Sequence, residues 1–418
     1  MGTATLLRID RDRLQQRLDG LASIGRLPDG GVWRIAYSDE DLAARQWVTA
    51  AMQAAGMTVT IDAAGNLIGR YAGTEDLPAL ATGSHIDTVP TGGRYDGALG
   101  VLAGIEAVAT LHEAGRRLRH AIEVIAFTDE EGEMIGSKAM AGTAKLSDPE
   151  HFRRLNGEAI QPCLERVGGN WAALPSARRT DQDIAAYLEL HVEQGGVLES
   201  EQCQIGVVQG IVSLQRFQVA ITGRPNHAGT TPMHLRQDAL YAASLLVAAV
   251  HDVAVDIPGD QVATVGLLTV APNAANIVPG RVELTIDMRD LSLETLGAMV
   301  EGLKQRIVAI QASTGTQIEL RPQHFVEPTL ASPAVQGAIA AVCDDLNLTH
   351  YSMPSRAIHD AQEIGRFTQM GMIFVPSQAG VSHAEDEYTS PEQCGQGADV
   401  LLHTLMALDE QLDSATHD

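Results

Sequence analysis

The sequence predicts an α/β protein with a mostly parallel sheet, into which a second, ferredoxin-like α+β domain is inserted. Short apolar runs at 79–82 and 122–127 flank an apolar helical stretch at 99–114. This strand–helix–strand order is typical of a parallel sheet buried on both faces. Residues 214–321 follow the order β-α-β-β-α-β, which indicates a ferredoxin-like sandwich. The length of 418 residues exceeds one ordinary core, so two domains are expected.

The start of the chain predicts two helices and a hairpin ahead of the parallel strands. Helices are expected at about 9–21 and 39–55, and Ser38 followed by acidic residues is a helix-start signal for the second. Strands at 58–61 and 67–71 flank a Gly-Asn turn and predict a β-hairpin.

The inserted block is predicted from its own run of strands and helices. Its expected elements are strands at 216–221, 262–270, 282–288 and 317–320 and helices at 238–253 and 293–313. Metal-type residues lie on both sides of this block, so it is expected to form a lid over the catalytic cleft. We therefore expect a catalytic domain at 1–213 and 328–418 and an inserted domain at 214–327. A strand at 373–375 and a helix at 397–412 complete the first domain.

Composition limits the partners and the compartment. The formal net charge of −24 argues against nucleic acid and anionic membranes, which attract clustered Lys and Arg. Four scattered cysteines without a Cys-x-x-Cys pair predict free thiols and a cytoplasmic location. No charged-then-apolar leader opens the chain, so no export signal is expected. The most apolar run, 239–255, is short for a membrane span and contains His251 and Asp252, which favours a buried helix.

Three groups of polar residues stand next to the predicted parallel strands. They are His85 with Asp87, Asp96, and Glu130 with Glu131. Open α/β sheets hold ligands at the carboxyl ends of their strands, so these side chains are expected at one sheet edge. His191 and His383 bring the set to three imidazoles and several carboxylates. That is the inventory of a two-zinc hydrolytic site with its own general base.

Each of these residues alone has a simpler interpretation. A histidine at a strand end is usually a satisfied polar residue, an Asp before a helix is usually an N-cap, and paired glutamates are usually a solvated first turn. Five ligand-type residues at strand ends or beside glycines favour the metal site instead. Asp87 is placed to accept the remaining N–H of His85 and fix its tautomer. His359 is left undecided.

These motifs resemble the hydantoinase/carbamoylase branch of the zinc aminoacylase and carboxypeptidase-type metallohydrolases. The matching stretches are 83–90, 92–100, 129–132, 189–195, 226–233, 276–280, 287–290 and 382–383. That branch contains N-carbamoyl-L-amino-acid hydrolases, allantoate and ureidoglycolate amidohydrolases and β-ureidopropionases. His191 is informative, since the similar peptide-cleaving relatives tend to carry an acidic ligand at this position.

The resemblance implies a metal site with two divalent ions per subunit, zinc first, with manganese, cobalt or nickel as alternatives. It implies that Asp96 bridges the two ions. His85 and His191 complete the protein ligands of one ion, and Glu131 and His383 complete those of the other. Glu130 remains as the general base for the attacking water.

The resemblance also implies the substrate contacts. Arg289 would clamp a carboxylate with its planar fork, although a surface ion pair with Asp287 or Asp290 is equally compatible with the sequence. Gln194 and Asn276 would supply amide contacts, and domain closure would carry Arg289 and Asn276 toward the metals. His227 would stabilise the oxyanion across a dimer interface, so the inserted domain is also expected to form a homodimer.

The predicted function is hydrolysis of the ureido (carbamoyl) group of an N-carbamoyl-L-amino acid or related ureido acid, with release of ammonia and carbon dioxide. The alternatives are an allantoate or ureidoglycolate amidohydrolase of purine catabolism, an aminoacylase or metallopeptidase, and an inactive relative. Two departures from the family pattern affect specificity. The 132–137 loop is short, and Arg356 and Ile358 stand in a stretch that is glycine-rich in the family.

Overall fold

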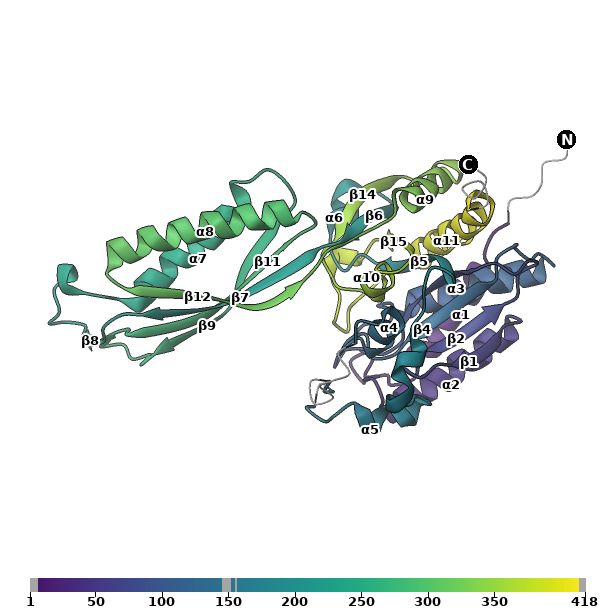
Figure 1. Cartoon of the computed structure of the whole chain (residues 1–418), viewed down its shortest axis with the longest axis horizontal. Coiled ribbons are helices and arrows are strands. Elements are labelled where there is room, and N and C mark those ends of the chain that lie inside the picture. Colours follow the sequence, from purple (N-terminus) through teal and green to yellow (C-terminus); the bar gives the residue numbers. More distant parts are fainter. Residues whose placement is uncertain (1–6, 145–151, 155, 413–418) are drawn as a thin grey trace. The chain divides into compact units, whose positions relative to one another are not determined.

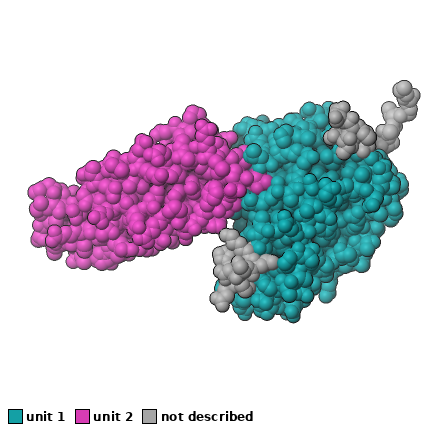
Figure 2. Space-filling view, in the orientation of Figure 1, with its two compact units in different colours: residues 1–210, 330–418 teal, residues 211–329 magenta. Residues whose placement is uncertain are grey.

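A computed structural model describes residues 7–144, 152–154 and 156–412 of the chain (Figure 1). Two compact units make up the structure (Figure 2). Unit 1 comprises Met1–Gly210 and Leu330–Asp418, and unit 2 comprises Ile211–Thr329. The chain thus leaves unit 1 once, forms unit 2, and returns to complete unit 1.

The sheet of unit 1 has a parallel centre and antiparallel flanks. Its strands run in the spatial order β1 (Thr58–Ile61), β2 (Leu67–Tyr71), β4 (Ile122–Phe127), β3 (Ala79–His85), β5 (Ile184–Val192), β15 (Gln369–Val375), β6 (Ile205–Ile211) and β13 (Thr329–Leu330), with β14 (His350–Ser355) paired to β6. Neighbours among β4, β3, β5 and β15 are parallel. The mixed α/β fold with a mostly parallel centre is therefore confirmed.

Helices bury the apolar side chains of this sheet in one large core. The contributing helices are α1 (Arg11–Ala22), α2 (Asp39–Ala54), α3 (Ala98–Glu113), α9 (Pro333–Asp345) and α11 (Pro391–Gln411). Every α3 residue from Ala98 to Leu111 is buried. A smaller cluster forms around α4 (Ile135–Ala141) and α5 (Gln161–Leu164), while α6 (Val197–Glu201) and α10 (Asp360–Ile364) are short connecting helices.

Local signals set the ends of several of these elements, and the first two below were predicted. The Ser38 hydroxyl accepts a hydrogen bond from Asp41 N (3.1 Å) at the start of α2, which satisfies a helix-terminal N–H. β1 and β2 pair antiparallel, which confirms the predicted hairpin. α11 begins with Pro391 and a capping box between Ser390 and Gln393.

Unit 2 is a four-stranded antiparallel sheet with two helices. Its elements are β7 (Ser213–Thr222), α7 (Ala239–Val255), β9 (Val262–Ala271), β11 (Arg281–Asp290), α8 (Leu293–Thr314) and β12 (Gln317–Val326), with sheet order β12-β7-β11-β9. This is the β-α-β-β-α-β order of a ferredoxin-like sandwich. A short ribbon of β8 (Asn226–His227) and β10 (Ile277–Val278) extends from it.

The sequence did not reveal every element. The central strand β5 is buried along almost its whole length, but Glu189 and His191 interrupt its apolar run, so it was not recognised as a strand. The helix expected to be buried, α7, buries one face and exposes Leu240, Tyr241 and Val247. Among the described helices, none combines the length and apolar character needed to cross a membrane.

Candidate metal centre

The parallel strands of unit 1 bring five predicted metal-binding residues together at one sheet edge. His85 ends β3, His191 lies near the end of β5, and Glu131 follows β4. Asp96 precedes α3, and His383 lies on the segment between β15 and α11. Among these five, ligand atoms lie within 4.8 Å of one another in two sets, His85–Asp96–His191 and Asp96–Glu131–His383, and a third group, Glu189–His191–His359, adjoins them through His191. Asp96 belongs to both sets.

The two carboxylate oxygens of Asp96 face different imidazoles. Asp96 Oδ1 lies 3.5 Å from His85 Nε2 and 3.2 Å from His191 Nε2. Asp96 Oδ2 lies 3.3 Å from His383 Nε2, which is in turn 3.5 Å from Glu131 Oε1. Asp96 therefore directs one carboxylate oxygen toward each of the two sets.

Backbone carbonyls fix the tautomers of two histidines. His85 Nδ1 bonds the carbonyl oxygen of Asp87 (3.0 Å), and His191 Nδ1 bonds that of Val192 (2.9 Å). A carbonyl only accepts, so both Nδ1 atoms carry a hydrogen, and in the neutral ring Nε2 is the atom left with a lone pair for a metal. The backbone N–H of Gly97 accordingly donates to His191 Nε2 (3.2 Å).

The expected role of the Asp87 side chain was wrong in detail. Its Oδ1 lies 3.8 Å from His85 Nδ1, beyond hydrogen-bond distance, because the carbonyl of the same residue already takes that N–H. The other oxygen, Oδ2, accepts a hydrogen bond from Glu131 N (3.2 Å). Asp87 thus fixes the His85 ring through its backbone and the Glu131 backbone through its side chain.

The donor set fits divalent cations. His85, Asp96 and His191 are at most 5% exposed. Burial and the charge of Asp96 raise the pKa of Glu131 to about 7, and the hydrogen bond to Asp96 raises the pKa of His383 to about 9. Buried carboxylates among imidazole lone pairs need either bound protons or a metal cation as counter-charge. Nitrogen and oxygen donors of this kind suit zinc and its neighbours.

Glu130 lies beside this donor set and outside the three-residue groups. Its Oε2 is 3.5 Å from His85 Nε2, and its side chain is 8% exposed. Burial raises the pKa of Glu130 well above its ordinary value, against the opposing charge of His85. A carboxyl group with a raised pKa next to a reaction centre is suited to accepting and returning a proton.

Gln194 also points at Asp96, which the sequence did not predict. Its Nε2 donates to Asp96 Oδ2 (2.8 Å), and its Oε1 is buried without a hydrogen-bond partner among the described residues. Gln194 and His383 both have positive φ, at 59° and 57°. Non-glycine residues in this backbone region cluster at functional sites.

His359, left undecided from the sequence, packs against the cluster. Its ring centroid is 4.5 Å from that of His191, with an edge-to-face geometry. Its Nε2 lies 2.9 Å from Ser355 Oγ. Burial lowers the pKa of His359 well below its ordinary value, so a neutral imidazole supports the ring of His191.

Unit 2 holds the three remaining predicted residues in two separate places. His227 pairs with Ile277 across the β8–β10 ribbon, and Ala228 N donates to the carbonyl of Asn276 (2.9 Å). His227 and Asn276 are therefore neighbours. Arg289 lies near the far end of β11, where its Nε donates to Asp287 Oδ1 (2.8 Å).

The expectation that domain closure carries Arg289 and Asn276 toward the metals stays a prediction, and the distance between the two residues within unit 2 bears on it. The ribbon with Asn276 leads into β11 at Arg281, whereas Arg289 is eight residues further on. At about 3.3 Å per strand residue, the two ends lie roughly 25 Å apart. The sequence motifs did not show this, because the distance depends on β11 running straight between them.

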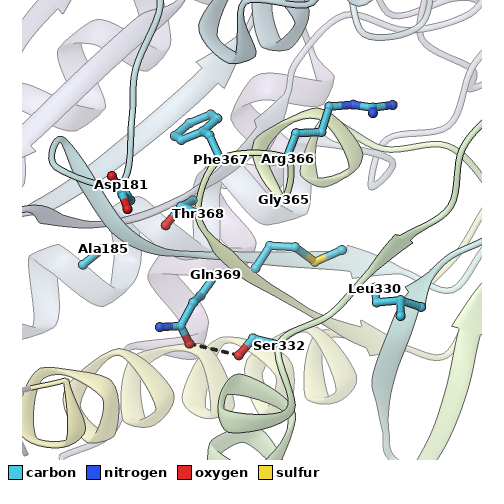
Figure 3. A pocket seen from close by; sticks show the side chains of 10 residues that line it. Asp181, Ala185, Leu330, Ser332, Gly365, Arg366, Phe367, Thr368 and Gln369 are labelled. Carbon is cyan, nitrogen blue, oxygen red and sulfur yellow. Dashed lines mark hydrogen bonds between the residues drawn. The ribbon is translucent and has the colours of Figure 1, made fainter. Parts of the chain in front are cut away.

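A hollow elsewhere in unit 1 is separate from the cluster. It has a volume of ≈ 430 Å³ and is lined by Asp181, Ala185, Leu330, Ser332 and residues 365–370 (Figure 3). Ala185 and Gln369 stand at the amino ends of β5 and β15, whereas His191 stands near the carboxyl end of β5. The hollow therefore lies at the amino ends of the parallel strands, whereas the candidate metal centre lies at their carboxyl ends.

The family follows from comparison with known proteins. The model of peptidase family M20/M25/M40 matches residues 81–407, so the chain belongs to this family. An N-carbamoyl-L-amino-acid amidohydrolase of Paenarthrobacter aurescens is 38% identical over 411 residues, which cover 97% of this chain and 100% of that protein. A ureidoglycolate hydrolase of Arabidopsis thaliana is 36% identical over 418 residues, with 97% and 88% covered.

Comparison with a solved structure identifies the group within this family to which the chain belongs. The hydantoinase/carbamoylase family amidase from Burkholderia multivorans superposes with a TM-score of 0.91 at 36% identity, covering 96% of this chain and 98% of that one. Within the larger family, the chain is thus a member of the hydantoinase/carbamoylase amidases.

Proposed function

We propose that this protein is a dinuclear metal-dependent amidohydrolase that hydrolyses the carbamoyl group of N-carbamoyl-L-amino acids or related ureido acids. The observation that carries the proposal is the position of Asp96, whose two oxygens face separate histidines. The likeness to an N-carbamoyl-L-amino-acid amidohydrolase along nearly the whole chain supports the substrate class.

In this proposal the two ligand sets each hold one divalent ion, zinc or alternatively manganese, cobalt or nickel. His85, Asp96 and His191 hold one, and Asp96, Glu131 and His383 hold the other. When bound, such a pair polarises the substrate carbonyl and makes water a stronger nucleophile at neutral pH.

Glu130 is the proton carrier of the reaction. It takes a proton from the attacking water and delivers it to the leaving nitrogen. Water adds at the carbamoyl carbon, the bond from that carbon to the terminal nitrogen breaks, and ammonia leaves. The carbamate that remains loses carbon dioxide to give the amino acid. The burial of Glu130 and its place outside both ligand sets support this role.

The substrate contacts are assigned to Arg289, Gln194 and His227. Arg289 would bind the substrate carboxylate, with Asp287 orienting its guanidinium. Gln194 would offer its unpartnered Oε1 to a substrate N–H. His227 Nδ1 accepts from the backbone N–H groups of Gly229 (3.0 Å) and Thr230 (3.2 Å). Its hydrogen therefore sits on Nε2, where it can be donated to an oxyanion.

A homodimer accounts for the separation of these contacts. A substrate amino acid is far shorter than the roughly 25 Å along β11, so His227 and Asn276 would serve the site of a second copy. The sheet of unit 2 ends at the edge strand β9, which exposes Leu267 and Leu268, and α7 beside it exposes Leu240 and Tyr241. An exposed edge strand next to apolar side chains favours pairing with an identical strand.

A substrate panel tests the proposal. Ammonia release would be measured with several N-carbamoyl-L-amino acids, N-carbamoyl-β-alanine, allantoate and ureidoglycolate on zinc- and manganese-loaded protein. The proposal expects turnover of the N-carbamoyl-L-amino acids. The likeness to a ureidoglycolate hydrolase favours ureidoglycolate as the second candidate substrate. Release from none of the ureido acids, with an N-acyl amino acid cleaved instead, would contradict the proposal.

A further inference from the structure

We propose that Glu387 is a positioning residue that ties the His383 segment to Asp96 and so sets the geometry of the second metal site. The inference rests on the proposed function, since it assigns a role at the same metal centre. Glu387 is 3% exposed and belongs to neither ligand set, so its part is to hold the ligands in place.

Both oxygens of Glu387 are engaged around Asp96. Glu387 Oε1 accepts hydrogen bonds from the backbone N–H groups of Tyr95 (2.9 Å) and Asp96 (3.0 Å). Glu387 Oε2 lies 2.9 Å from the Ser382 hydroxyl, which is also 3.0 Å from Asp96 Oδ2. One side chain thus fixes the backbone of Asp96 directly, while the Ser382 hydroxyl, with one hydrogen to donate, lies between the two carboxylates.

These contacts leave no room for a side chain at the adjoining turn. A Cβ placed on Gly93 would come within 2.1 Å of the Glu387 carboxyl carbon. The Glu387 carboxylate therefore packs directly on the backbone of the turn that leads to Asp96. A glycine at this position allows that close approach.

The two halves of the centre differ in how firmly their ligands are held. His85 and His191 stand on buried strands, and carbonyl oxygens fix both rings. The His383 side chain is 48% exposed and lies on the connection between β15, which ends at Val375, and α11, which begins at Pro391. No strand pairing fixes this connection among the described residues, so its hydrogen bonds set the place of His383.

Glu387 makes the longest-range of these bonds, to Tyr95 and Asp96, which lie 292 and 291 positions earlier in the sequence. Asp96 belongs to both sets, but only the second also depends on the His383 segment. Loss of the Glu387 side chain is therefore expected to weaken the Asp96–Glu131–His383 set more than the His85–Asp96–His191 set. Residues that orient metal ligands typically change metal affinity by about 10–100-fold when they are removed.

The test compares Glu387→Ala with Glu387→Gln and with the control Glu385→Ala. Glu385 is exposed and lies two residues before Glu387. Metal-free full-length protein would be titrated with zinc against a chromophoric chelator. Wild type and Glu385→Ala should bind two equivalents, whereas Glu387→Ala should keep one and bind the second about 10–100-fold more weakly. Glutamine can accept from the two N–H groups and donate to Ser382, so Glu387→Gln should largely restore the second site.

Anomalous zinc scattering from crystals of Glu387→Ala would identify the retained site, expected between His85, His191 and Asp96. If Glu387→Ala does not fold, Ser382→Ala removes one link only and should weaken the second equivalent in the same direction, by several-fold.

Three outcomes overturn the inference. The first is that Glu387→Ala, or Ser382→Ala if the former does not fold, binds two equivalents of zinc with wild-type affinity. The others are an equal loss of affinity at both metal sites and an equal loss of the second equivalent in Glu387→Ala and Glu387→Gln. Wild-type protein that binds fewer than two equivalents would instead contradict the proposed function.

Discussion

Asp96 Oδ1 lies 3.2 Å from His191 Nε2, while the other oxygen of the same carboxylate faces His383. The two contacts point to opposite halves of the cluster, and this carboxylate joins them. Three residues of the cluster, His85, Glu131 and His191, depend on parallel strands for their position, because β3, β4 and β5 end at the same edge of the sheet. The fourth, Asp96, lies before α3, and its backbone N–H donates to Glu387. The fifth, His383, depends on a connecting segment and on the side chains that hold it.

Glu130→Gln is expected to leave metal content unchanged and to lower kcat by about 10²–10⁴-fold, because the amide keeps the shape of the side chain but cannot accept a proton. Metal analysis and steady-state kinetics on an N-carbamoyl-L-amino acid check this. A variant that keeps wild-type turnover would remove Glu130 from the proton-carrying role. Lost metal would assign it to the ligands instead.

Arg289→Lys is expected to raise KM more than it lowers kcat, since a lysine ammonium cannot reproduce two parallel bonds to a carboxylate. Arg281→Lys is a matched control on the same strand, because Arg281 forms an exposed pair with Glu283. KM values for the two variants should therefore differ. Equal KM values would place the carboxylate contact elsewhere.

Mixed dimers test whether sites are shared between protomers. His227→Ala and Arg289→Ala protein would each be inactive, and mixing after partial unfolding and refolding should restore activity. Random reassociation would make half of the dimers mixed, and each mixed dimer would have one intact site out of two. The expected activity is therefore about a quarter of that of wild type. Activity that stays at the level of the separate variants would mean that each chain supplies both residues to its own site.

The contact between α1 and α3 provides a test of the fold independent of the metals. Glu106 on α3 is fully buried and pairs with Arg13 and Arg17. Glu106→Gln should lower the free energy of unfolding by about 3 kcal/mol, because two partly buried guanidinium groups lose their counter-charge. Glu113→Gln, at an exposed position that also contacts Arg13, should cost less than about 1 kcal/mol. Urea denaturation of the metal-free protein measures both, and equal losses would contradict a special role for Glu106.

The sequence predicted the parts of the site that depend on strand order. His85, Asp96 and Glu131 were assigned to one edge because a parallel strand fixes where its last residues stand. It missed β5 because Glu189 and His191 sit in an otherwise apolar run, and their polar character hides a buried strand. Glu387 gave no sequence signal, because Glu385 and Asp386 beside it are equally acidic and exposed. Only the folded loop distinguishes them.

The distance between Arg289 and Asn276 could also not be predicted from the sequence. Both belong to motifs that match the family, and nothing in the motifs gives the distance between them. The strand β11 carries Arg289 to one end of the unit 2 sheet, while the β8–β10 ribbon keeps Asn276 at the other. In the proposed homodimer, His227 would therefore come from the second protomer.

The most direct test of a shared Asp96 is zinc stoichiometry in Asp96→Ala and His383→Ala, measured by elemental analysis after dialysis. A carboxylate that joins the two sites predicts two zinc ions per chain in wild type, one in His383→Ala and none held tightly in Asp96→Ala. Two ions retained in Asp96→Ala, or a single ion in wild type, would contradict the dinuclear centre.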